Sequence, residues 1–93
     1  MAKAIIVTER DNKVSVRFTD NMQERVERLK IDRFNLLFVE DVSGGTTDKI
    51  SQLRHALVVA QFEPRNEVVI NALNTALQKL IAKQKKLDRK LYV

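Results

Sequence analysis

The chain has 93 residues and a net charge of +5, with 44% hydrophobic and 31% charged residues, as in an ordinary folded domain. It contains no cysteine, which excludes disulfides, thiolate metal sites and cysteine nucleophiles. No apolar run approaches the roughly 20 residues of a membrane-spanning helix, and no leader-like segment precedes the first element, so we expect a single domain without membrane contact, located in the cytoplasm.

The first elements in the chain are two short strands. Residues 4–8 form a β-branched run, and Asp11-Asn12 after it suits a tight turn. Residues 13–19 then alternate between apolar and polar, with Val14, Val16 and Phe18 on one face and Lys13, Ser15, Arg17 and Thr19 on the other. This pattern predicts a hairpin with one core face and one cationic face. Pairing of residues 4–8 with a second copy of the chain is an alternative.

A short amphipathic helix is expected from Asp20 to about Ile31. Its apolar positions, Met22, Val26 and Leu29, fall at helical spacing. Asp20 or Thr19 can serve as the N-cap, with Gln23 or Glu24 as the partner of a capping box.

The middle of the chain changes character twice. Residues 34–39 are apolar almost throughout, which favours a buried strand, although periodicity alone leaves a helix open. Residues 43–47 have the composition of a loop between two elements, and Thr47 or Asp48 can cap the next helix. The apolar stripe of that helix comprises Ile50, Leu53, Leu57 and Ala60, broadened by Ala56 and Val58.

The last segment, residues 63–93, follows a body of residues 1–62 and predicts a long helix with Pro64 in its first turn. Apolar residues recur at alternating spacings of three and four, as in a coiled coil. We expect the first half to pack on the body and the second half to pair with another subunit through Leu77, Leu80, Gln84, Leu87 and Leu91. The predicted fold is therefore α+β, with short N-terminal strands followed by helices and a long C-terminal amphipathic helix.

Positive charge is concentrated in this final segment. Six basic residues and one acidic residue lie between Lys79 and Lys90, whereas the rest of the chain carries eleven of each. Such an asymmetry indicates an anionic partner, either nucleic acid or an acidic protein surface. Lys83, Lys85 and Lys86 are candidates for binding phosphates, and the alternative is an exposed helix face that lysine keeps soluble.

Two parts of the chain resemble the ribbon-helix-helix family of small dimeric DNA-binding repressors and plasmid accessory proteins. The first part is the strand 14–18 with the helix after it, which has Asp20 as its expected cap. The second part is the run from Gly45 through Arg54 to Ala56-Leu57. The likeness covers about half the chain, and the long hydrophobic link 32–44 departs from the family pattern. It implies a dimer in which Lys13, Ser15 and Arg17 face base edges in the major groove and Thr46 and Thr47 lie near a phosphate.

No combination of residues predicts a reaction centre. His55 is the only histidine and has no triad partner in its neighbourhood, and Glu40-Asp41 is a lone acidic pair. We therefore expect neither enzyme activity nor a cofactor or metal. The predicted function is a homodimeric DNA-binding protein, a repressor or mobile-element accessory factor. The alternative is a protein-interaction module that oligomerises or docks on an acidic partner through its C-terminal helix.

Overall fold

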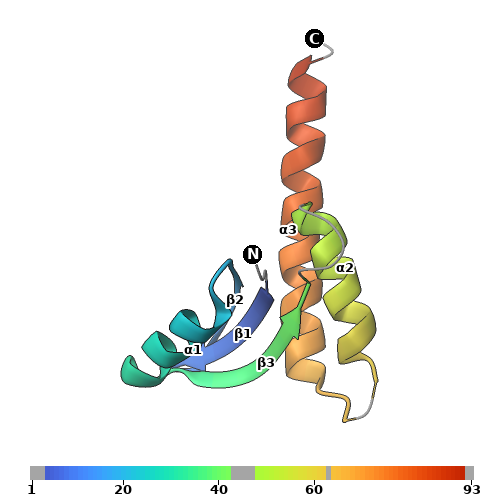
Figure 1. Ribbon diagram of the computed structural model, residues 1–93. Coiled ribbons are helices and arrows are strands. Elements are labelled where there is room, and N and C mark those ends of the chain that lie inside the picture. Colours follow the sequence, from blue (N-terminus) through green and yellow to red (C-terminus); the bar gives the residue numbers. More distant parts are fainter. Residues whose placement is uncertain (1–3, 43–47, 63, 92–93) are drawn as a thin grey trace.

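The computed structural model describes residues 4–42, 48–62 and 64–91, with the backbone alone from 87 to 91. The elements in chain order are β1 (Ala4–Arg10), β2 (Lys13–Thr19), α1 (Met22–Ile31), β3 (Asn35–Asp41), α2 (Lys49–Ala60) and α3 (Glu67–Leu91). The predicted α+β fold is confirmed, and Figure 1 shows the curved sheet beside the helical pair α2 and α3. None of the helices in these ranges is both long enough and apolar enough to cross a membrane.

The three strands form an antiparallel sheet in the order β2-β1-β3. β1 and β2 make the predicted hairpin, in which Arg10 pairs with Lys13 across a two-residue turn. Asp11 and Asn12 both take left-handed backbone angles, with φ of 53° and 64°. That pair of angles is typical of a type I′ turn, which matches the twist of the flanking strands.

β1 is the central strand and is buried on both of its faces. Ile5 and Val7 belong to the main hydrophobic core with α2 and α3. Ile6 and Thr8 alternate with them and are also fully buried, so a second layer covers the opposite face. α1 provides that layer, with Leu29 as its buried residue, on the side of the sheet away from α2 and α3 (Figure 1).

β3 confirms that the apolar run after α1 is a strand. A register shift opposite Val7 and Thr8 leaves Leu37 as an extra residue, and this bulge allows both Leu37 and Phe38 to pack against the main core. The strand is less buried than expected, because it lies at the sheet edge and leaves Leu36 44% exposed.

α1 ends at Ile31, as predicted, but its N-cap differs from the sequence prediction. Its N-cap is Asn21, not Asp20 or Thr19, and Glu24 is the capping-box partner. At its C-terminus the N–H of Phe34 donates to the carbonyl of Leu29 at 2.9 Å, while Arg33 has a φ of 62°. This is a Schellman motif with arginine in the left-handed position that glycine usually occupies.

α2 and α3 pack side by side against the sheet (Figure 1). Asp48 caps α2 as predicted, and the residues of α2 buried in the core are Leu53, Ala56 and Ala60. Val58 was expected to broaden this stripe but is 56% exposed. The start of α3 also differs, because Asn66 caps it and Pro64 precedes the first turn.

Candidate nucleic-acid interface

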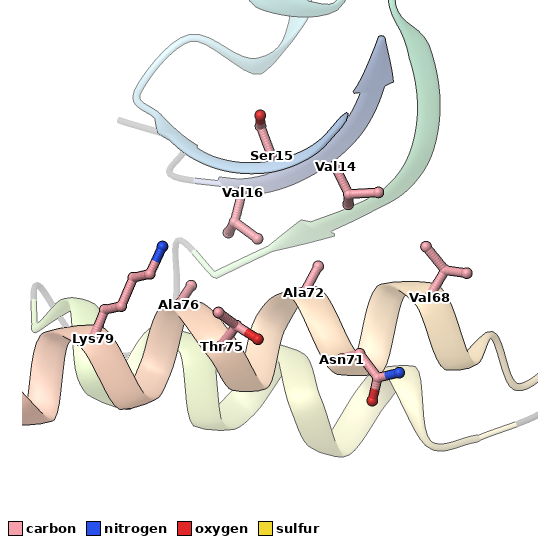
Figure 2. A pocket seen from close by; sticks show the side chains of 9 residues that line it. All are labelled: Val14, Ser15, Val16, Val68, Asn71, Ala72, Thr75, Ala76 and Lys79. Atoms are coloured by element: carbon pink, nitrogen blue, oxygen red, sulfur yellow. The ribbon is translucent and has the colours of Figure 1, made fainter. Parts of the chain in front are cut away.

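The predicted reading face of β2 lies on the side of the sheet that α1 covers. Lys13 is exposed, whereas Ser15 and Arg17 are half-buried. Figure 2 shows Ser15 on the opposite side of β2 from Val14 and Val16, which point toward α3. The alternation of the strand is therefore as predicted, but only Lys13 of the three candidate residues on its polar face is exposed.

The guanidinium of Arg17 packs against an aromatic ring of its own chain. Its Cζ atom lies 4.9 Å from the centroid of the Phe34 ring, and Arg10 Cζ lies 5.2 Å from the same centroid. Both distances are within the range of cation–π attraction. Sequence reasoning missed this cluster because Phe34 follows α1, and only the pairing of the strands brings it to the two arginines.

The lysines of α3 form the most accessible group of positive charges. Lys79, Lys83, Lys85 and Lys86 are all exposed. Lys79, Lys83 and Lys86 follow one another at intervals of four and three residues, so they lie on the same side of the helix. None of these lysines makes an ion pair with any described side chain. We call the segment 82–86 the lysine arm.

The lysine arm begins where α3 leaves the core. Leu77 is buried and Leu80 and Ile81 pack partly against the core, whereas every side chain from 82 to 86 is exposed. Figure 1 shows this end of α3 extending past α2 and the sheet. The longest dimension of the molecule, 47 Å against 29 and 26 Å, follows from this extension.

The residues predicted for oligomerisation separate into three groups. Leu77 and Leu80 contribute to the protein's own core, which leaves Leu77 little surface for a second chain. Gln84 is exposed in the lysine arm. Leu87 and Leu91 lie within α3, and their side chains are outside the described part of the chain.

We compared the chain with protein-family models, curated proteins and solved structures. None of them matches. The resemblance to ribbon-helix-helix proteins therefore stays a prediction. The structure differs from what that resemblance implies in two respects, since β2 pairs with β1 of its own chain and β3 lies between the first two helices.

The start of α2 was predicted to lie near a phosphate. Thr46 and Thr47 fall outside the described residues, so the geometry of that site begins at Asp48. The carboxylate of Asp48 accepts from the backbone N–H of Ile50 at 3.3 Å and from the Ser51 hydroxyl at 3.0 Å. The Asp48 carboxylate therefore supplies an acceptor for a free N–H group at the start of α2. It also places negative charge where a phosphate would have to approach.

One contact between titratable groups was not expected from the sequence. Glu40 on β3 and His55 on α2 lie 3.3 Å apart, measured from Oε1 to Nε2. They are 15 residues apart in the chain, and the packing of α2 on the sheet joins them. Within the described ranges, no three histidine, aspartate or glutamate side chains come close enough together to hold a metal ion.

Proposed function

We propose that this protein is a non-enzymatic DNA-binding protein, and that its lysine arm binds the phosphate backbone of duplex DNA. The observation that carries the proposal is the projection of exposed lysines, unpaired among the described side chains, beyond the core at the end of a long helix. Outside residues 79–90 the chain carries eleven basic and eleven acidic residues, so the segment that contains the lysine arm supplies the attraction to a polyanion.

The lysine arm and Lys79 together have a geometry that suits a polyanion. The three lysines on one side of α3, Lys79, Lys83 and Lys86, span about 10 Å at 1.5 Å per residue. Duplex DNA carries one negative charge per about 1.7 Å of axis, so several phosphates face a ridge of that length. Lysine contacts a phosphate as a point charge without reading the base, and we therefore expect binding with little sequence preference.

The proposal rests on α3 and not on β2. A ribbon that reads bases needs arginine side chains free to reach into the major groove. Arg17 is half-buried with its guanidinium against Phe34, and Ser15 faces the α1 side of the sheet. Lys13 remains accessible, but one lysine does not provide base readout.

An acidic protein surface is the other partner that positive charge would suit. Helices that dock on proteins usually insert apolar anchors into a groove. The lysine arm offers three lysines, one glutamine and one alanine, and no large apolar side chain. Its attraction is therefore electrostatic throughout, which fits the regular charge of a nucleic acid better than the mixed surface of a protein.

Fluorescence anisotropy with a labelled duplex of mixed sequence tests the proposal. We expect the wild-type chain to bind at low salt, and the triple variant Lys83→Gln, Lys85→Gln, Lys86→Gln to lose at least about tenfold in affinity, because each lost phosphate contact removes counterion release. Glutamine keeps the helix propensity of the segment close to that of lysine.

The control removes the same charge elsewhere on the surface. The substitutions Arg28→Gln, Lys30→Gln and Arg54→Gln change three exposed residues of α1 and α2. We expect a smaller loss from this variant than from the arm variant. Equal losses from both variants would contradict a specific role for the arm. Displacement of the DNA by poly-glutamate at equal charge concentration would contradict the preference for a nucleic acid over an acidic protein.

A further inference from the structure

A groove of about 640 Å³ lies between β2 and α3 (Figure 2), and β2 is the edge strand opposite β3 in the sheet. Val14 and Val16 point into it from the strand, and Val68, Ala72 and Ala76 face them from the helix. The polar residues that also line it are Ser15, Asn71, Thr75 and Lys79. The groove therefore has apolar side chains on both of its facing walls.

The strand wall of this groove is an open sheet edge. β2 pairs with β1 on one side, and no strand in the described part of the chain pairs with its other side. In a hairpin closed by a two-residue turn, the pair beside the turn is hydrogen-bonded, and bonded and non-bonded pairs then alternate. Arg10 and Lys13 are that first pair. The N–H and C=O groups of Val14, Val16 and Phe18 therefore point outward, away from β1.

We infer that the occupant of this groove is the same strand of a second copy, with the two β2 strands antiparallel about a two-fold axis at Val16. The result is a six-stranded sheet in a symmetric dimer. This inference goes beyond the proposed function and does not depend on it. Lys79 lines the groove, whereas Lys83, Lys85 and Lys86, the lysines that the DNA-binding test replaces, do not.

The axis at Val16 follows from the pattern of side chains on β2. It places Val16 opposite Val16 and Val14 opposite Phe18, so the apolar face continues across the junction. Lys13 lies opposite Thr19, and Ser15 opposite Arg17, so no like charges face each other.

Other registers are less favourable. A shift of the pairing by one residue places apolar residues opposite polar ones and sends one strand's apolar face to the wrong side. An axis at Ser15 places Lys13 opposite Arg17, and an axis at Arg17 places that arginine opposite itself. Directly opposed like charges destabilise a strand pair, so only the axis at Val16 aligns all seven residues of β2 without repulsion.

α3 is compatible with the same axis. It packs over β2 more than over β1, so two copies would bring two α3 helices side by side. The two-fold axis also reverses the direction of the second α3. The two lysine arms then point away from each other, which keeps their like charges apart.

Sedimentation equilibrium of the full chain tests the dimer. We expect the wild type to be a dimer at about 100 µM, a concentration that is about a hundred times a Kd of 1 µM. The substitution Thr75→Arg places a bulky charge on the exposed helix wall of the groove and should give a monomer. Asn74→Arg adds the same charge to the same helix outside the groove, and should leave the dimer intact. A monomeric wild type would overturn the inference and leave the groove to an extended segment of another protein. A dimer insensitive to Thr75→Arg would also overturn it.

A mixed-disulfide experiment tests the register. The wild-type chain has no cysteine, so the variants Lys13→Cys and Thr19→Cys each introduce a single thiol. In the proposed dimer these positions form a non-hydrogen-bonded pair with Cα atoms about 4.5 Å apart, which is within disulfide range. We expect mild oxidation to join the two variants in a mixture and to join neither variant to itself. Cross-linking of one variant alone, or none in the mixture, would contradict the axis at Val16.

Discussion

Asn21 turns the chain from β2 into α1. Its Oδ1 accepts from the backbone N–H of Glu24 at 3.1 Å, and its Nδ2 donates to Glu24 Oε2 at 3.1 Å. The Thr19 hydroxyl donates to the carbonyl of Asn21 at 3.1 Å. These bonds satisfy a free donor of the first helical turn and fix the direction in which α1 leaves the sheet.

Replacing this cap should weaken the fold measurably. We expect Asn21→Ala to lower the free energy of unfolding by about 1 kcal/mol, because the N–H of Glu24 then loses its side-chain acceptor. Asp20→Ala is the matched control and should change the free energy by less than about 0.5 kcal/mol, as for an ordinary surface position. Urea denaturation followed by circular dichroism measures both. A larger effect at Asp20 than at Asn21 would show that the cap lies one residue earlier.

The sequence predicted a cap in this region but not its position. Thr19, Asp20 and Asn21 are all residue types that cap helices well, so local propensity does not choose among them. The β1–β2 pairing extends to Thr19 opposite Ala4, so it excludes Thr19 as the cap by placing that residue in the strand. The length of this strand pairing depends on the folded structure and not on the local propensity of the three residues.

At the scale of elements, the packing of Leu53, Ala56, Val58 and Ala60 on α2 follows the 3.6-residue helical period. Leu53, Ala56 and Ala60 recur at intervals of three and four and are buried in the core. Val58 is apolar but lies between these positions on the helix surface, and it is 56% exposed. Helical position therefore predicts burial better than the apolar character of the residue does.

Two alanine substitutions on α2 test this assignment. Leu53 is fully buried, and we expect Leu53→Ala to lower the free energy of unfolding by about 2–5 kcal/mol through lost burial and a residual cavity. Val58→Ala should change it by less than about 0.5 kcal/mol. Chemical denaturation of the two variants under identical conditions gives the comparison. Similar losses from both would mean that Val58 is covered in solution.

For the whole molecule, the sequence predicted which segments form strands and helices but not how the strands are ordered. The continuous burial of Ala4 to Thr8 fits a central strand, although the sequence allowed an edge strand paired with another copy. The sequence left residues 34–39 open between strand and helix, and the pairing of β3 with β1 shows that residues 35–39 belong to a strand. The contact of Phe34 with Arg10 and Arg17 depends on both of these tertiary arrangements.

The charge of the molecule was predictable because it depends only on positions in the chain. The excess of lysine near the C-terminal end needs no knowledge of the fold. The fold adds that the three lysines of the lysine arm lie beyond the core on a projecting helix. A body of balanced charge with a cationic arm should be attracted to DNA mainly by electrostatics, and that attraction should weaken steeply with salt.

The salt dependence of DNA binding is the most direct test of the central claim, which is that the lysine arm contacts phosphates. The measurement is the slope of log affinity against log salt concentration for the wild type and for the Lys83→Gln, Lys85→Gln, Lys86→Gln variant. We predict a steep wild-type slope that becomes shallower in the variant by up to about 2.7, at about 0.9 for each lost phosphate contact. Equal slopes for the two proteins would contradict the account.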